Sequence, residues 1–251
     1  MPYSLGGVWT NGKPFRIHSA AHNYTRRRPY HYTLGLALHS SSLGLLILAG
    51  AVSVIHFDSH LDTSDPKVLG GGLSHYAYVT LRLCGPGANV DRGVNHGTFL
   101  HIAHEEGLVR NTSIHAGIRA PVSNKKYDLK NDKACGFKIH TARELDRIGM
   151  QGYIDKLKDR VAGTKVYISV DIDVLDPAFA PATGTAEVGG WTTRELLTIL
   201  DGFEGIEVIG ADVVEVAPVY DNPGETTTLA AAEVVHSLIR LMVEKPVKGV
   251  Q

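Results

Sequence analysis

Cysteine is scarce in this sequence, because Cys84 and Cys135 are the only two among 251 residues. Two cysteines cannot build the disulfide framework of a small secreted domain, and their scarcity favours a reducing compartment. An excess of one charge is also lacking, since 25 basic and 26 acidic residues leave a net charge of −1. This balance gives no electrostatic reason to expect nucleic acid or an anionic membrane as a partner.

A signal peptide is not evident either, because no clean apolar core precedes a cleavage site near the basic residues Arg26, Arg27 and Arg28. We therefore expect a cytoplasmic or mitochondrial protein. The apolar stretch at residues 34–55 is interrupted by His39 and four serines and runs directly into Asp58. We interpret it as a buried helix followed by a strand rather than a membrane span.

The most informative stretch begins where that apolar segment ends. Residues 52–55 are apolar and partly β-branched, which predicts a buried strand. Asp58, His60 and Asp62 follow at every second position, and alternate residues of an extended chain point to the same side. Clustering two carboxylates without a cation is costly, so we interpret this motif as half of a metal site rather than a polar turn.

A second stretch supplies the other half. Residues 166–170 predict another buried strand, followed by Asp171 and Asp173 and stopped by Pro177. Strands alternate with helices along the chain, which predicts a parallel sheet covered on both faces. Acids at the carboxyl ends of two such strands would meet at one sheet edge. Carboxylates with imidazole and no thiolate suit Mn²⁺ best, and the number of candidate ligands favours two ions.

These motifs carry a family resemblance. Asp-x-His-x-Asp, followed far downstream by Ser-x-Asp-x-Asp-x-x-Asp-Pro, resembles the ureohydrolase family of arginases and agmatinases, most closely the agmatinase branch. Residues 178–190 and 210–218 continue the similarity. The resemblance implies a three-layer α/β/α fold with a mainly parallel sheet. Residues 34–251 would form this arginase-like domain, after an atypical or truncated N-terminal segment at residues 1–33.

The resemblance also implies a ligand set for two manganese ions. Asp58 and Asp171 would bridge the ions, His60 and Asp173 would complete one site, and Asp62 with His39 would complete the other. Leu38 stands where the family has an aspartate before this histidine, so the support of His39 is altered. His75 follows a run of glycines that looks similar, but its place in the chain order argues against a role as ligand. Residues 76–91 look like an insertion relative to the family.

The implied reaction is hydrolysis of a linear guanidino compound, most simply agmatine to urea and putrescine. His96 would transfer a proton, and Glu215 would pair with the guanidinium in a bidentate fork. The alternatives are guanidinobutyrate or another guanidino substrate, and a ureohydrolase-like protein with impaired catalysis. The resemblance further implies a small-molecule partner and a homo-oligomer, either a trimer or a hexamer.

Local signals complete the expected architecture. Capping boxes at residues 141–144 and 192–195 predict two helix starts, while residues 123–133 read as a polar loop. Residues 226–244 predict a terminal helix whose apolar face includes Leu229, Val234, Leu238 and Leu241. We expect Asp176 to fix a turn rather than bind metal, and Trp191 to lie in the core or the pocket wall.

Overall fold

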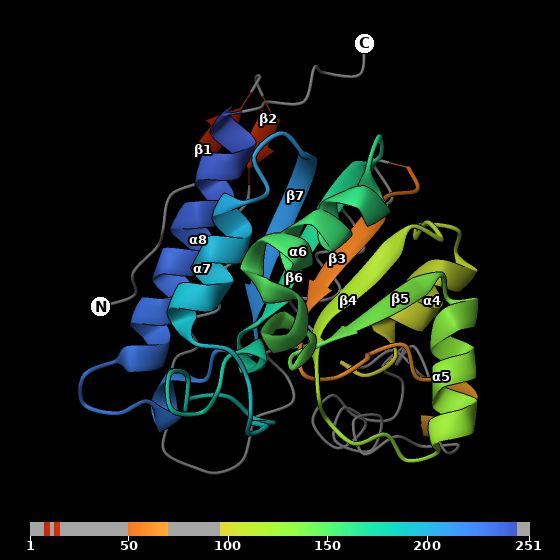
Figure 1. The fold of residues 1–251 in the computed structure, drawn as a ribbon, viewed down its shortest axis with the longest axis horizontal. Helices are drawn as coiled ribbons and strands as arrows, with labels where there is room; N and C mark the ends of the chain where they lie inside the picture. The colour runs from red at the N-terminus through yellow and green to blue at the C-terminus, as the bar shows by residue number, and fades with distance from the viewer. Residues whose placement is uncertain (1–7, 11–12, 16–49, 70–95, 245–251) are drawn as a thin grey trace, which may run out of the picture.

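The computed structural model describes residues 8–10, 13–15, 50–69 and 96–244. His39, His75 and the insertion predicted at residues 76–91 lie outside these ranges. Near the N-terminus, β1 (Val8–Thr10) and β2 (Lys13–Phe15) form a small antiparallel pair. The rest of the described chain forms one α/β unit around a central sheet (Figure 1).

The sheet has five parallel strands in the order β5-β4-β3-β6-β7. Their bounds are β3 Ser53–Phe57, β4 Ser113–Ile118, β5 Phe137–Thr141, β6 Lys165–Asp171 and β7 Glu207–Val214. Strands β3 and β6 are neighbours, with Phe57 opposite Val170 at the last paired position. Asp58 and Asp171 therefore follow adjacent positions at the same edge of the sheet, as the sequence predicts.

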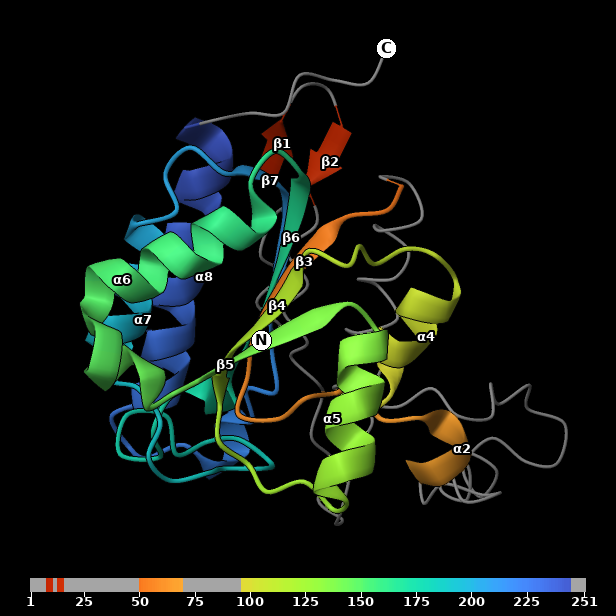
Figure 2. The same ribbon diagram turned by 45° about the vertical axis from the view of Figure 1, so that its right-hand side comes forward.

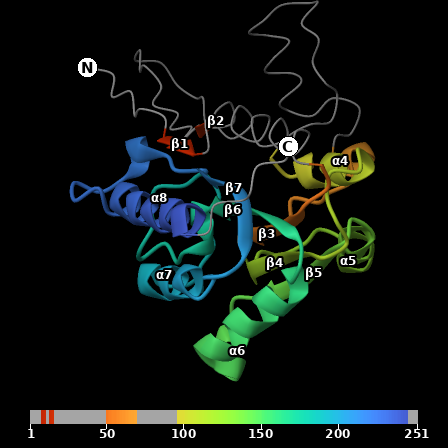
Figure 3. The same ribbon diagram turned by 90° about the horizontal axis from the view of Figure 1, so that it is seen from above.

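Helices cover both faces of the sheet, so the three-layer prediction is confirmed (Figures 2 and 3). One face carries α6 (Glu144–Val161), α7 (Thr193–Asp201) and α8 (Thr226–Glu244). The other carries α4 (Phe99–Glu105) and α5 (Lys125–Ala134), with the short α2 (Pro66–Leu69) near them in Figure 2. Along β3, Ile55 and Phe57 join the larger core, while Val54 joins a smaller one with Phe99 and with Val52, which precedes the strand. This alternation buries both faces.

Two local predictions are wrong. Residues 123–133 are not a loop, because α5 begins there with the Asn124 side chain accepting a hydrogen bond from the Tyr127 N–H (3.2 Å). The helix buries little apolar surface, so its pattern resembles that of a solvated loop. The capping box at residues 141–144 does not form either. Thr141 ends β5, and Arg143 precedes α6 without a capping side-chain hydrogen bond.

Other local predictions are confirmed. Thr192 and Glu195 form the expected capping box at the start of α7. Trp191 is buried in the larger core. In α8, Val234, Leu238 and Leu241 are buried, but Leu229 is 60% exposed, so its assignment to the apolar face is wrong. Residues 226–243 are long and apolar enough to cross a membrane, yet α8 packs on α7 and β7 as a core helix would.

Arg119 ties the two sides of the sheet edge together. It follows β4, and its guanidinium donates hydrogen bonds to the carbonyl oxygens of Asp173 (2.6 Å), Leu175 (3.1 Å) and Glu187 (2.7 Å). A Cβ at residue 190 would lie 2.5 Å from Arg119 Nη2, so this position requires glycine. Asp176 accepts hydrogen bonds from the N–H groups of residues 178, 189 and 190, which supports its predicted role in a turn.

We predict that Arg119→Lys destabilises the protein and loosens the end of β6. Lysine keeps the charge but cannot hold a planar fork of donors, and each buried carbonyl left without a donor costs about 1–3 kcal/mol. The free energy of unfolding, measured by urea denaturation, should therefore fall by about 2 kcal/mol or more. Stabilisation by added Mn²⁺ should fall as well.

Arg160→Lys is the matched control, because Arg160 also donates to backbone carbonyls, those of Asn111, Ser113 and Gly136. These lie at the amino ends of β4 and β5. This control should lose stability but keep the response to Mn²⁺. Equal metal responses in the two variants would contradict the positioning role of Arg119.

Candidate metal centre

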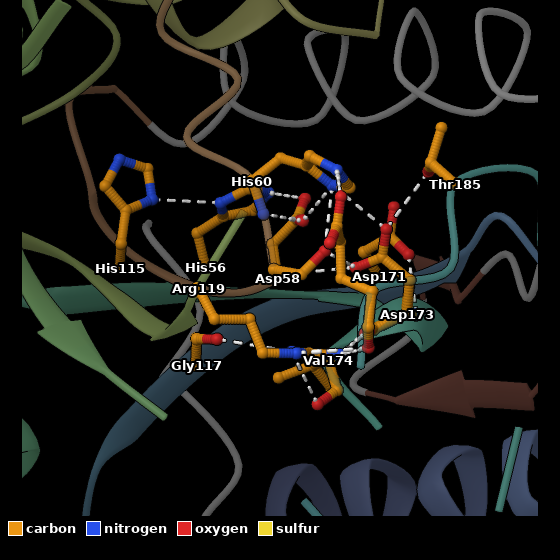
Figure 4. A network of polar contacts seen from close by, with 12 residues as sticks. His56, Asp58, His60, His115, Gly117, Arg119, Asp171, Asp173, Val174 and Thr185 are labelled. Atoms are coloured by element: carbon orange, nitrogen blue, oxygen red, sulfur yellow. Dashed lines mark hydrogen bonds and ion pairs between the residues drawn. The ribbon is translucent and has the colours of Figure 1, made fainter. Parts of the chain in front are cut away.

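The end of β3 turns the chain sharply around the carboxylate of Asp58. This side chain is 1% exposed, and its Oδ1 accepts the His60 backbone N–H at 2.5 Å. The His60 ring follows, with Nδ1 at 3.2 Å from Asp58 Oδ1 and 3.0 Å from Asp173 Oδ2. Asp58, His60 and Asp173 thus form one group of donor atoms that could hold a cation (Figure 4).

The end of β6 is held from both strands. Asp171 Oδ1 accepts the Asp173 N–H at 2.8 Å and starts a turn of 3-10 helix at Ile172–Val174. Asp173 Oδ1 accepts hydrogen bonds from the Ser59 N–H (3.0 Å) and hydroxyl (2.8 Å), and Oδ2 accepts one from the Thr185 hydroxyl (3.1 Å). The carboxylate of Asp173 is therefore oriented before any ligand arrives.

A second group of donors contains His56, Asp58 and Asp62, so Asp58 belongs to both groups. Asp62 has a φ of 55° and Glu215 a φ of 61°, a left-handed conformation that is uncommon outside glycine. Such strain persists only where the surrounding structure imposes it, and it clusters at functional sites. Both residues lie just beyond a strand and line the same cavity.

That cavity has a volume of about 750 Å³ and opens above the carboxyl edge of the sheet. Its lining includes most of the predicted site residues that the structure describes: Asp58, His60, Asp62, His96, Asp171 and Glu215. Asp173 does not line the cavity but contacts His60, with Asp173 Oδ2 at 3.0 Å from His60 Nδ1. His39 lies outside the described residues.

The acids of the site repel one another. Burial, followed by the charge of neighbouring carboxylates, raises the pKa values of Asp62, Asp171 and Asp173. The same causes raise the pKa of Glu215 to about 7. Burial would disfavour a charged His60, but Asp173 and Asp58 outweigh it and raise the pKa of that imidazole to about 11. The site therefore attracts positive charge.

Asp58 is the exception among these acids. Burial opposes its ionisation, but His56 and His60 outweigh that effect and hold its pKa below the usual range. His96 precedes α4 at the rim of the cavity, where desolvation and the nearby His60 lower its pKa. A neutral His96 can accept or pass on a proton near neutral pH.

The structure adds residues that the sequence interpretation missed. His56 lies two positions before Asp58 and so extends the alternation of Asp58, His60 and Asp62 backward, a signal that was available in the sequence. His115, on β4, contacts His56, and Asp132, on α5, contacts His115 in turn. Arg119 and Thr185 orient Asp173 from residues far away along the chain.

The donor set fits a divalent cation on structural grounds. Asp58 Oδ2 is buried and accepts no hydrogen bond from any residue in the described ranges. Buried acids without such partners are costly, and a cation would supply the missing charge. The atoms on offer are carboxylate oxygens and imidazole nitrogens, a combination that suits Mn²⁺ and related ions.

Known proteins are similar to this chain in sequence and in structure. The sequence profile of the Arginase family matches residues 37–240. Candidate agmatinase 1 of Schizosaccharomyces pombe is 52% identical over 199 residues, covering 79% of this chain and 46% of that protein. Guanidinopropionase of Pseudomonas aeruginosa is 33% identical over 199 residues, covering 79% and 55% respectively. The chain thus spans about half the length of these relatives.

A solved structure gives the same result. Proclavaminate amidino hydrolase from Streptomyces clavuligerus superposes with a TM-score of 0.67 at 30% identity, covering 83% of this chain and 61% of that one.

We predict that the metal-free protein loses stability as the pH rises from about 4 to 8. An acid whose pKa is raised by folding holds its proton more tightly in the native state, so stability falls once the unfolded chain ionises near pH 4. Asp171→Asn keeps the oxygen that accepts the Asp173 N–H. It should therefore raise the melting temperature at pH 8, by about 2–4 °C per kcal/mol of relieved repulsion.

The measurement is thermal unfolding in chelator across this pH range. Asp159→Asn, an exposed acid on α6, should leave the curve unchanged. Added Mn²⁺ should stabilise the unmodified protein at pH 8 and the Asp171 variant much less. A lower melting temperature for Asp171→Asn at pH 8 would contradict the repulsion described above.

Proposed function

This chain belongs to the arginase family, and we propose that it hydrolyses the guanidino group of a small linear cation, with agmatine as the favoured substrate and urea and putrescine as products. One observation carries the proposal. Two donor groups that share Asp58 lie at a cavity that Glu215 also lines. Hydrolysis of a guanidinium needs a site for cations and a carboxylate that can pair with the guanidinium, and this cavity offers both.

Manganese is the proposed cofactor, with two ions per chain. Asp58, His60, Asp62, Asp171 and Asp173 would hold them, with one further imidazole. When bound, such a pair supplies an activated water nucleophile and charge stabilisation. This requirement for divalent ions accounts for the concentration of acids at a buried sheet edge.

The chain's own residues position the substrate. Glu215 is half-buried and lines the cavity beside Gly184, where a Cβ would lie 4.0 Å from Glu215 Oε2. Ionised Glu215 would pair with the guanidinium in a bidentate fork. The bond from the guanidino carbon to the substituted nitrogen breaks as the carbon gains an oxygen. His96 would deliver the proton that the departing amine nitrogen needs.

The rest of the cavity favours a substrate with a second positive charge. Asp65 and Asp128 line it together with Tyr127, whose hydroxyl donates to Asp65 Oδ2 at 2.8 Å. No lysine or arginine lines the cavity among the residues whose positions are described. An ammonium tail is attracted by such a surface, while a carboxylate tail is repelled. This supports agmatine over guanidinobutyrate and over the substrate named for the Pseudomonas relative.

We predict Mn²⁺-dependent urea release from agmatine by the full chain, with kcat/KM at least about tenfold higher than for guanidinobutyrate, a difference of about 1.4 kcal/mol. The charge of the cavity wall is the physical reason. A urea assay over a panel of guanidino compounds gives the comparison, and manganese content is measured on the same samples.

Glu215→Gln is the matched variant for this assay. It should keep manganese but lower kcat/KM for agmatine by about 100-fold or more, because the guanidinium loses its charged partner. Bound manganese without urea release from any compound would favour the reading of impaired catalysis. Equal rates with guanidinobutyrate would contradict the proposed substrate.

A further inference from the structure

The backbone that follows Glu215 is tied to the start of α8 through two hydrogen bonds. The Ala217 N–H, two residues after Glu215, donates to the Ala182 carbonyl oxygen at 2.9 Å. The Ala182 N–H donates in turn to the Thr227 hydroxyl oxygen, also at 2.9 Å. Ala182 and Thr227 are completely buried. One side chain on α8 is therefore connected, through a single intervening residue, to the segment that carries Glu215.

The start of α8 is itself held in place by a carboxylate. The Thr227 N–H donates to Asp221 Oδ1 at 3.1 Å, and the Thr228 N–H donates to Asp221 Oδ2 at 2.8 Å. N–H groups in the first turn of a helix have no acceptor inside the helix, so Asp221 satisfies two that would otherwise lack one. The rest of α8 packs on α7 and β7. The Thr227 hydroxyl is thus presented by a capped, packed helix rather than by a loop.

The backbone at Glu215 needs such an anchor. Its φ of 61° is left-handed, and a conformation of this kind persists only where the surrounding structure imposes it. Strand β7 ends at Val214, so regular strand structure does not continue through Glu215. The hydrogen bond from Ala217 to Ala182 supplies a fixed point two residues further along the chain.

The same anchor reaches a second part of the cavity wall. Thr183, Gly184 and Thr185 directly follow Ala182 and line the cavity together with Glu215. Gly184 lies close enough that a Cβ there would be 4.0 Å from Glu215 Oε2. A shift of the Ala182 backbone would therefore move the wall segment and the carboxylate that it faces.

We propose that Thr227 is a positioning residue for the guanidinium site, because its hydroxyl holds Ala182 and Ala182 holds the segment that carries Glu215. This rests on the proposed hydrolysis, in which Glu215 pairs with the guanidinium. Thr227 does not line the cavity and acts only through other residues. A bidentate fork requires two hydrogen bonds to form together, and a misplacement of about 1 Å can cost on the order of 100-fold in rate.

The test compares Thr227→Val with Thr227→Ser in the manganese-loaded full chain. Valine has nearly the shape of threonine but leaves the Ala182 N–H without its acceptor, whereas serine keeps the hydroxyl. In Thr227→Val, kcat/KM for agmatine should fall by about 10–100-fold while the manganese content stays unchanged. Thr227→Ser should restore most of the lost rate.

Thr164→Val is the matched control. The Thr164 hydroxyl donates to Ser53 Oγ at 2.8 Å and to the Val161 carbonyl oxygen at 2.6 Å, just before β6 and at the opposite end of the sheet from the cavity. This variant also loses hydrogen bonds, so its melting temperature should fall. It should nevertheless keep the kcat/KM of the unmodified protein at temperatures where both are folded.

A second measurement needs neither metal nor activity. Amide hydrogen exchange, followed by nuclear magnetic resonance on the metal-free protein, reports on the Ala217 N–H, which keeps its own acceptor in every variant. In Thr227→Val this amide should exchange at least about tenfold faster, because its acceptor residue is no longer anchored. Thr227→Ser and Thr164→Val should keep it slow.

The two measurements separate this proposal from the proposed hydrolysis. If the unmodified chain releases no urea, the proposed hydrolysis fails, but exchange at Ala217 still decides whether Thr227 holds the segment after Glu215. Slow exchange at Ala217 in Thr227→Val would overturn the proposal. So would an unchanged kcat/KM in an active Thr227→Val, a loss that Thr227→Ser does not restore, or an equal loss in Thr164→Val.

Discussion

Repulsion among buried carboxylates is the constraint on which this structure depends. Asp58 and Asp171 leave neighbouring strands at one edge of a parallel sheet, and Asp62, Asp173 and Glu215 join them. Burial and mutual charge raise the pKa values of four of these acids. Such an arrangement is unfavourable unless positive charge is supplied. His60 supplies part of it by bridging Asp58 and Asp173, and His56 Nε2 lies 3.2 Å from Asp58 Oδ2. A bound cation would supply more.

The surrounding fold holds these acids in place at a cost. Arg119 donates hydrogen bonds to backbone carbonyls just after β6, and Asp62 and Glu215 adopt left-handed backbone conformations. Both features oppose relaxation of the acids away from one another. The larger core on the α6, α7 and α8 face offsets this cost, because Phe57 and its neighbours are completely buried directly behind the site. Stability is concentrated on one face of the sheet and function at its carboxyl edge, as in other open α/β proteins.

Much of this could be predicted from local patterns. Apolar, β-branched runs identify β3 and β6, and alternate acids after each strand predict that Asp58 and Asp171 meet. The support of the site could not be predicted in the same way. His115 reaches His56 only because β4 pairs with β3 in a register that places these residues opposite each other. Asp132 lies on α5, whose polar sequence resembles a loop, so nothing local identified it as a buried partner.

The central claim is that this sheet edge holds two cations that share Asp58. Diffraction from crystals of the manganese-loaded protein, recorded at the manganese absorption edge, tests it most directly. We expect two anomalous peaks, one beside His60 and Asp173 and the other beside Asp62, with Asp58 next to both. A single peak, or two peaks of which only one lies next to Asp58, would contradict the account.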